Sequence, residues 1–398
     1  MITGQGTVNA LGNNVAETLD ALQEGRCGIR KLDIPDLERL TIKIGAQVQG
    51  FSPEHYFDRR QIALFDRTTQ FSYLAAKEAI EQSGLSFAGD LAVDSGVVLG
   101  TAGGGTTTTD ENYRVVYEQG KNRIHPFVVP KLMNNAAASQ ISMAYNLQGP
   151  SFSVASACAS SNHAMGQAFN IIRSGMATTM ITGGADAMLC FGGMKAWEGL
   201  RVMSPDACRP FSCGRNGMVQ GEGAAIFVFE EREQAMARGA EILAEVAGFS
   251  MTSDASDIVK PNRKGAERAI IGALRDARID RQHVDYINAH GTGTMINDAV
   301  ECAAIANVFG DHAKRLMISS TKSMHGHLMG GAGAVELLAC IMALRDGVIA
   351  PTIGYLGPDT ECALDVVPNE ARKAKVHAVL TNAFAFGGMN AVLALKTG

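Results

Sequence analysis

A cysteine, two histidines and a lysine stand in short motifs of small residues and could together carry out acyl transfer. Cys158 lies in residues 151–161, SFSVASACASS, where an alternating pattern gives way to helical spacing. Unpaired N–H groups and the helix dipole at such a junction favour a thiolate and can hold an oxyanion. The pattern predicts Cys158 as a nucleophile at a helix N-terminus, although a buried structural thiol would give the same local sequence.

A histidine motif follows a segment that we expect to be a strand. His290 lies in NAHGTGT, residues 288–294, directly after the expected strand 284–287. The carboxyl ends of strands are where α/β proteins place their sites. Glycines let a ligand approach the backbone, and the hydroxyls of Thr292 and Thr294 can hydrogen-bond it.

A second basic motif, SSTKSMHGH at residues 319–327, contains Lys322 and His327 and also follows an expected strand. The next expected helix contains Glu336, and a later motif, NAFAFGG at residues 382–388, has glycines that can aim a backbone N–H at a site. Each motif alone is compatible with an ordinary turn. One shared site explains them together, with the nucleophile, N–H donors and oxyanion hole that acyl transfer needs.

The elements that must position these motifs alternate between strands and helices. Short apolar runs predict strands at 97–99, 179–182, 225–229, 284–287, 316–319 and 391–395. Amphipathic stretches predict helices at 67–83, 159–174, 265–277, 298–309 and 333–345. This alternation predicts an α/β architecture with mostly parallel sheets.

The chain shows a weak internal sequence repeat. A glycine-rich turn at 221–223 precedes one expected strand, and the glycine pair 387–388 precedes the last one. We interpret this as two diverged halves of similar topology that share one packed body without a linker. The predicted domains are residues 1–248, with the cysteine, and residues 249–398, with the histidines and lysine.

Composition excludes several classes of protein. The 398 residues are 46% hydrophobic and 19% charged, and 35 basic against 40 acidic side chains give a net charge of −5. A net negative chain argues against nucleic acid as a partner. Eight cysteines without a CxxC pair indicate a reducing, cytoplasmic location and no zinc site. No signal peptide is recognised, and residues 328–344 are expected to form a buried helix and not a membrane span.

The whole chain resembles a β-ketoacyl-acyl carrier protein synthase of the thiolase-like superfamily, close to synthase II and the nodulation-type ketosynthases. The resemblance is carried by ACASS, NAHGTGT, STKSMHGH, GAGAVE, NAFAFGG and PFSCGRNGMVQGEGAAIFVFE. It implies duplicated βαβ halves in a five-layered αβαβα body. It also implies decarboxylative Claisen condensation of malonyl-acyl carrier protein with a cysteine-bound acyl chain, in fatty acid or specialised lipid or polyketide biosynthesis.

The resemblance further implies roles for individual residues. Cys158 would hold the acyl chain, while His290 and His327 would donate hydrogen bonds to the malonyl thioester oxygen. Lys322 would be an electrostatic anchor paired with Glu336. The remaining implied residues are the oxyanion and gate residues Phe386 and Gly387 and the phosphopantetheine-binding Thr292 and Thr294. No metal or nicotinamide is implied, because the substrates are carried on the phosphopantetheine arm of acyl carrier protein.

Two positions depart from the family pattern. Met389 stands where a threonine usually follows the glycine pair, which affects the gate formed by Phe386. Gly103 stands where a bulky aliphatic side chain often limits the acyl pocket. Losing that side chain either opens a cavity or lets neighbours collapse into it. We expect a deeper or differently shaped acyl tunnel, and a local loop adjustment is the alternative.

Partners follow from charge and from the resemblance. Acyl carrier protein is acidic, so docking needs a local basic patch, for which Arg59, Arg60, Arg67 and Arg201 are candidates. The family forms twofold dimers, and residues 150–157 are a candidate interface strand. A homodimer is expected, with a heterodimer of this chain and a paralogue as the alternative.

Rival functions share parts of this pattern. A degradative thiolase has a Cys-His-Cys arrangement, and a type III synthase has Cys-His-Asn, whereas His327 after Lys322 favours the two-histidine decarboxylating class. A papain-like hydrolase needs surroundings of the nucleophile that are absent here. The remaining alternative is a non-catalytic or specificity-setting subunit of a ketosynthase heterodimer. Such subunits typically lose the nucleophile, which this chain retains.

Overall fold

Two five-stranded mixed sheets form the framework of the computed structural model, which describes residues 1–398. The first sheet has the order β1 (Ile2–Asn9), β7 (Gly223–Glu230), β6 (Thr179–Asp186), β4 (Ser95–Gly100), β5 (Ser151–Val154). The second has the order β8 (Glu245–Ser253), β14 (Met389–Lys396), β13 (Ala378–Ala385), β9 (Tyr286–Asn288), β10 (Met317–Ser319).

The two sheets have the same topology. In each, the second, third and fourth strands of the half are parallel, and the fifth strand pairs antiparallel with both the fourth and the first. The expected duplicated halves are therefore confirmed. The chain leaves the first sheet at Glu230 and enters the second at Glu245. The predicted division at residues 248 and 249 falls inside β8.

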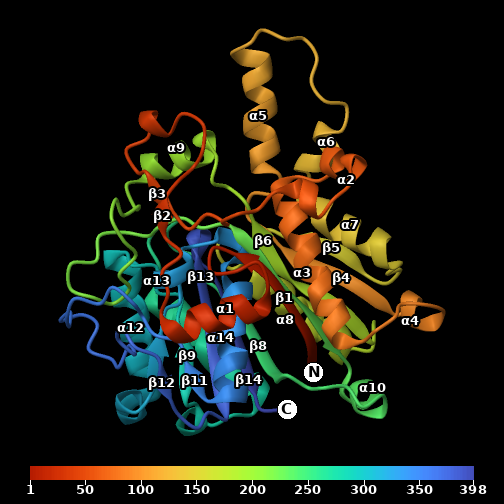
Figure 1. Cartoon of the computed structure of the whole chain (residues 1–398). Helices are drawn as coiled ribbons and strands as arrows, with labels where there is room; N and C mark the ends of the chain where they lie inside the picture. The colour runs from red at the N-terminus through yellow and green to blue at the C-terminus, as the bar shows by residue number, and fades with distance from the viewer.

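The helices complete five layers (Figure 1). Helices α8 (Ser160–Arg173) and α14 (Ala332–Asp346) pack between the two sheets. Helices α3 (Arg67–Ser83) and α7 (Ala136–Tyr145) pack on the first sheet from outside, and α11 (Arg263–Ala277) and α12 (Met295–Phe309) form the outer layer of the second half. The thiolase-like fold expected from the resemblance is confirmed.

Local sequence explains two of these helices. Asp66 caps α3 through a hydrogen bond that its carboxylate accepts from the Thr68 N–H at 2.8 Å, and Gly84 ends the helix with φ +69°. Such caps satisfy N–H and C=O groups that a helix end leaves unpaired. Helix α14 is buried from Ala332 to Leu344 because sheets cover both of its sides, which explains its apolar run. No helix of the protein has the length and apolar character required to cross a membrane.

Shorter elements complete the chain. Helix α5 (Thr106–Tyr117) projects from the body beside α6 (Val128–Leu132) (Figure 1). The other short helices are α1 (Val15–Glu24), α2 (Arg59–Leu64), α4 (Asp90–Val93), α9 (Phe191–Leu200), α10 (Arg232–Ala237) and α13 (Lys322–His325). Two small ribbons pair β2 (Arg30–Lys31) with β3 (Ile44–Gly45) and β11 (Val348–Ile349) with β12 (Arg372–Lys373).

Candidate active site

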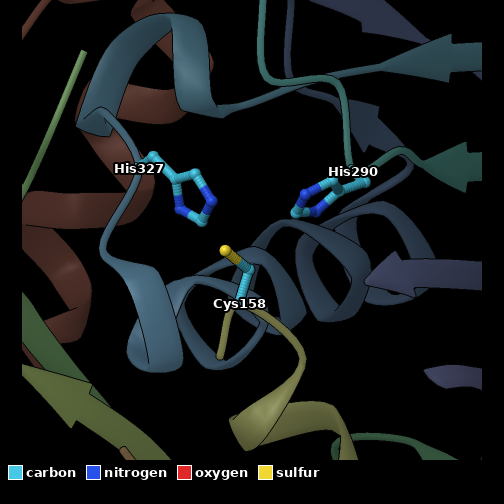
Figure 2. A group of neighbouring side chains, drawn as sticks. All are labelled: Cys158, His290 and His327. Atoms are coloured by element: carbon cyan, nitrogen blue, oxygen red, sulfur yellow. The ribbon is translucent and has the colours of Figure 1, made fainter. Parts of the chain in front are cut away.

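Cys158, His290 and His327 converge on one space although they come from both halves of the chain. Cys158 follows β5, His290 follows β9, and His327 follows β10 and α13. Figure 2 shows the sulfur and both imidazole rings directed toward one another. One donor atom of each residue lies within 4.8 Å of the other two, and all three side chains are buried. The three groups can therefore contact the same small molecule.

A tight turn presents Cys158 to this space. The preceding residue, Ala157, has φ +48°, a left-handed conformation that costs a non-glycine residue about 1–2 kcal/mol. The Ser160 hydroxyl holds the turn, since it accepts from the Ser156 N–H at 2.9 Å and donates to the Ala157 carbonyl at 2.6 Å. The Cys158 N–H donates to no backbone carbonyl, so it is available as an oxyanion donor.

The protonation state of Cys158 differs from the sequence-based expectation of a thiolate. Burial raises the pKa of the Cys158 thiol to about 12, and the nearby Lys322 ammonium opposes this shift without overcoming it. Desolvation is the largest of the causes, so burial decides the direction of the pKa shift. The resting nucleophile is a thiol, and it must lose its proton as it attacks.

The hydrogen bonds of the two histidines fix which ring nitrogen carries the proton. The Nδ1 atom of His327 accepts from the Met329 N–H at 3.1 Å, which leaves its proton on Nε2. The Nδ1 atom of His290 lies 3.4 Å from the Lys322 Nζ, which can only donate. Both rings therefore carry an Nε2–H, and that of His327 has no partner within the protein.

Both imidazoles are neutral at physiological pH. Burial, reinforced by the Lys322 ammonium, holds the pKa of His290 and that of His327 well below the usual value for histidine. A neutral Nε2–H is a hydrogen-bond donor that needs no protonation event. The pair is suited to stabilise negative charge that develops on a substrate oxygen.

Lys322 is the fixed cation behind the histidines. Its side chain is fully buried, it forms an ion pair with Glu336 of α14, and it donates to the His290 carbonyl at 2.6 Å. Burial raises the pKa of Glu336, and the Lys322 ammonium opposes this shift. The pair anchors the His290 loop to the central helix layer.

Phe386 and the two glycines after it form a turn at the end of β13. Gly387 has φ +81° and donates its N–H to the Ile258 carbonyl at 2.8 Å, so its left-handed backbone favours glycine. The Phe386 ring stacks on Trp197 of α9, with ring centroids 5.9 Å apart. The Met389 side chain packs against this turn, since a Cβ on Gly387 would lie 3.1 Å from its Cε.

A cavity of about 270 Å³ leads to these groups. Thr292 and Thr294 line it with their hydroxyls 2.9 Å apart, and Arg201 and Lys260 are exposed residues of its lining. Gly103 is not among the lining residues. Of the residues predicted from the sequence, the cavity is lined by Cys158, His290, His327, Thr292, Thr294 and Phe386, whereas Lys322, Gly387, Glu336 and Gly103 lie outside its lining.

The four candidate docking arginines differ in their surroundings. Arg59 and Arg60 are exposed on α2, whereas Arg67 forms a two-point ion pair with the buried Glu222, at 2.9 and 2.6 Å. Arg67 is also only partly exposed and its charge is already neutralised, so Arg59, Arg60 and Arg201 are better placed for the expected docking patch. Of the four, only Arg201 lines the cavity.

Sequence reasoning missed several residues that shape the site. Glu301 of α12 accepts from the His290 and Gly291 N–H groups at 2.9 and 2.8 Å and thereby fixes the histidine loop. Trp197 lines the cavity, and its being the only tryptophan in the chain was an available signal. No sequence pattern marked Glu301, because the N–H groups that donate to it lie on another element.

A metal ion is poorly suited to this site despite its ligand types. Cysteine and histidine are zinc ligands, and these three side chains are close enough to share an ion. However, the Lys322 ammonium lies 3.4 Å from the Nδ1 of His290 and would repel a cation. The high thiol pKa of Cys158 adds a cost, because zinc binds the thiolate.

Comparison with known proteins decides the family. Residues 1–235 match the family model of the β-ketoacyl synthase N-terminal domain, and residues 243–356 match that of the C-terminal domain. The chain belongs to the β-ketoacyl synthase family. This β-ketoacyl synthase is a condensing enzyme of the acyltransferase type, as the resemblance implied.

Individual relatives agree over the whole chain. The synthase is 47% identical to Nodulation protein E of Rhizobium sp. (strain N33), covering 100% of this chain and 98% of the relative. It is 39% identical to 3-oxoacyl-[acyl-carrier-protein] synthase 2 of Staphylococcus aureus, with full coverage of both. A solved structure of the ishigamide ketosynthase/chain length factor superimposes with a TM-score of 0.95 at 35% identity, covering 100% of this chain and 98% of that one.

Proposed function

We propose that this synthase condenses malonyl-acyl carrier protein with an acyl chain held on Cys158. The observation that carries the proposal is the meeting of a buried thiol with two neutral Nε2–H donors. One group accepts an acyl chain, and the other two stabilise an enolate oxygen. No nicotinamide or metal takes part, because each step below is an acyl transfer or a decarboxylation.

The first step loads the enzyme. The Cys158 sulfur attacks the carbonyl carbon of an acyl-phosphopantetheine thioester, and the N–H groups of Cys158 and Phe386 hold the oxyanion. The pantetheine sulfur leaves and takes up the proton that Cys158 loses. One thioester replaces another, so the step is nearly balanced in energy and the product is a Cys158 acyl-enzyme.

The second half-reaction forms the carbon–carbon bond. The malonyl thioester oxygen accepts hydrogen bonds from the Nε2–H groups of His290 and His327. The bond to the carboxylate then breaks and releases CO₂, and its electron pair forms an enolate. The enolate carbon attacks the Cys158 thioester, Cys158 leaves and takes up one proton, and a β-ketoacyl thioester remains on the carrier.

The cavity fits the carrier's phosphopantetheine arm. Thr292 and Thr294 offer hydroxyls along it, and Arg201 and Lys260 place positive charge among its exposed residues. Opposite charge on an acidic acyl carrier protein would favour encounter. Fatty acid and specialised lipid or polyketide pathways use this same chemistry, and we place the enzyme with its carrier in the cytoplasm.

We further propose that the synthase forms a homodimer through β5. This strand is an edge of the first sheet, and Ser151 and Phe152 on it are exposed. Pairing of the strand with a second copy would satisfy its free backbone groups and cover the Phe152 ring. A heterodimer with a paralogue would use the same edge, and light scattering of the protein alone distinguishes the two.

Intact-mass spectrometry with a panel of acyl-carrier thioesters tests the proposed function. We expect one acyl adduct on the wild type, no adduct on Cys158→Ala, and adducts without condensation product on His290→Ala and His327→Ala. A wild type that takes no acyl chain, alone or with a paralogue, would overturn the proposal. It would favour the non-catalytic subunit instead.

A further inference from the structure

The basic motif at residues 319–327 contains a buried histidine that no step of the proposed reaction uses. His325 is the last residue of α13, two residues before His327, and it is fully buried. It does not line the cavity. Both of its ring nitrogens are hydrogen-bonded, Nδ1 to the Gly326 carbonyl at 2.8 Å and Nε2 to the Thr321 hydroxyl at 2.9 Å. This ring therefore joins two segments of the protein and has no nitrogen left for a substrate.

The partners of His325 fix which of its nitrogens carries the proton. The Gly326 carbonyl can only accept, so Nδ1 carries a proton and donates it. Burial, reinforced by the Lys322 ammonium, lowers the pKa of His325 to about 3, so the ring is neutral and its Nε2 has no proton. That nitrogen therefore accepts from the Thr321 hydroxyl. The Thr321 oxygen in turn accepts from the Asn288 side-chain amide at 3.4 Å.

The Nδ1 side of the ring holds the peptide group that leads into His327. The carbonyl of this group, from Gly326, accepts from His325, and its N–H, from His327, donates to the Val219 carbonyl at 2.7 Å. Opposite edges of one peptide plane are thus held by two different segments. Gly326 has φ +67°, a left-handed conformation that glycine adopts without strain. Without the bond from His325, this flexible glycine would let the plane rotate and move the His327 ring.

The Nε2 side of the ring reaches the strand that carries the other histidine of the site. Asn288 is the last residue of β9 and stands two residues before His290. Because its amide donates to the Thr321 hydroxyl, which donates to His325, a chain of hydrogen bonds runs from β9 to the His325 ring. The ring continues this chain to the peptide group of His327. His325 therefore connects the two loops that carry the imidazoles of the site.

We propose that His325 is a positioning residue that sets the relative placement of the His290 and His327 rings. The centroids of these rings are 5.4 Å apart, and both rings face the Cys158 sulfur (Figure 2). One substrate oxygen must accept from both Nε2–H groups, so a shift of either ring lengthens a hydrogen bond to the enolate. This inference rests on the proposed function, because it concerns the step in which the two rings stabilise the enolate.

Amide substitutions separate the two hydrogen bonds of His325, because asparagine and glutamine hold their amides at different distances from the backbone. His325→Asn places an N–H donor near the position of Nδ1 and can keep the bond to the Gly326 carbonyl. His325→Gln places an acceptor oxygen near the position of Nε2 and can keep only the bond from Thr321. His325→Leu removes both bonds.

Each variant is measured in both half-reactions with carrier-bound substrates. Acylation of Cys158 is followed by intact mass without malonyl carrier, and CO₂ release is then followed in single turnovers of the acylated enzyme. His325→Leu should slow CO₂ release by roughly 10–100-fold, since a displacement of about 1 Å can cost 10²-fold, and should leave acylation nearly unchanged. His325→Asn should recover most of the lost rate and His325→Gln little of it. Thr321→Val, which removes only the hydroxyl, should slow CO₂ release less than His325→Leu.

Met324→Ala is the matched control for general loosening of α13. Met324 is fully buried on the same helix, but it belongs to an apolar cluster separate from that of Cys158. Urea unfolding should show a lower stability for this variant, while its rate of CO₂ release should stay near that of the wild type. The comparison of His325→Asn with His325→Gln keeps the test decisive even where His325→Leu folds poorly.

The outcomes separate this inference from the proposed function. Wild-type CO₂ release in His325→Gln, or equal losses in His325→Asn and His325→Gln, would overturn the role of His325 and leave the condensing activity intact. A loss in Met324→Ala as large as in His325→Leu would also overturn it, as would a loss of acylation equal to the loss of CO₂ release. Absence of both the acyl adduct and CO₂ release in the wild type would instead overturn the proposed function.

Discussion

The two halves of the synthase use one topology for different chemistry. Strands β5 and β10 occupy the same place in their sheets, yet the turn after β5 presents a thiol and the segment after β10 presents Lys322 and His327. The loop after β6 continues to Met188, and its counterpart after β13 carries Phe386. Equivalent strand ends meet at one site, so duplication supplies two sets of loops that can specialise separately.

The difference between the halves is chiefly electrostatic. Cys158 of the first half lies in an apolar cluster to which both halves contribute, and burial keeps its thiol protonated. The second half buries a lysine, its glutamate partner and the two neutral imidazoles. An apolar wall suits an acyl chain, whereas fixed donors suit an enolate. On the proposed function, the first half would supply the nucleophile that takes the acyl chain, and the second half would stabilise charge.

The largest effect is expected from removal of the nucleophile, which tests this assignment of roles to the two halves directly. Cys158→Ala should abolish condensation, by on the order of 10³-fold or more, since the nucleophile has no substitute. It should leave slow release of CO₂ from malonyl thioester, because the histidines are untouched. Measuring both products in one assay checks this, and equal loss of the two would show that the halves do not act separately.

Removing a histidine tests the other part of the assignment, in which the second half stabilises charge. His327→Ala and His290→Ala should each lower CO₂ release and condensation by roughly 10²–10³-fold, the usual cost of one donor to a developing oxyanion. Acylation of Cys158 in a single-turnover mass assay should change far less. Loss of acylation equal to the loss of decarboxylation would place the histidines in the first step and contradict the division.

Breaking the buried ion pair of the second half, between Lys322 and Glu336, should have a large effect on the stability of the protein. The substitution Lys322→Met leaves Glu336 buried without its partner. Breaking such a pair lowers the free energy of unfolding by about 3–5 kcal/mol. Urea unfolding measures the change. Lys322→Met/Glu336→Leu should recover part of it, because no isolated charge remains, and an exposed pair such as Lys314–Asp311 gives the matched control with little effect.

The thiol of the first half predicts a distinctive pH dependence. Because burial raises the pKa of Cys158 to about 12, its thiolate fraction should grow about tenfold per pH unit through pH 10 without a plateau. Alkylation of Cys158 followed by peptide mass spectrometry measures this rate. A plateau between pH 7 and 9 would show that the helix end outweighs desolvation after all.

The smallest effects are expected at the exposed cations of the cavity lining, where we propose that the carrier docks. Arg201→Glu and Lys260→Glu should each raise KM for carrier-bound substrate by roughly fivefold or less, and should leave pantetheine mimics unaffected. Arg232→Glu, an exposed change on α10, is the control. Equal changes with carrier and mimic would refute docking at these residues and point to an altered cavity.

Much of this protein was determined by local sequence. The predicted helix 67–83 coincides with α3, and the helix predicted over 159–174 is α8, because periodicity and capping act over a few residues. The motifs around Cys158, His290 and His327 were also recognisable, since each is a continuous stretch after a strand. They identified the family and the residues that the fold gathers at one site.

Only the tertiary structure decided how those residues behave. Three properties depend on segments that are distant in the chain. They are the thiol pKa of Cys158, the pairing of Arg67 with Glu222 and the contact between Gly103 and Met188. Desolvation and side-chain packing depend on what the fold brings alongside, and no periodicity encodes that. Sequence therefore determined which groups are present, and packing between the two halves decided their charge, their partners and the space left for a substrate.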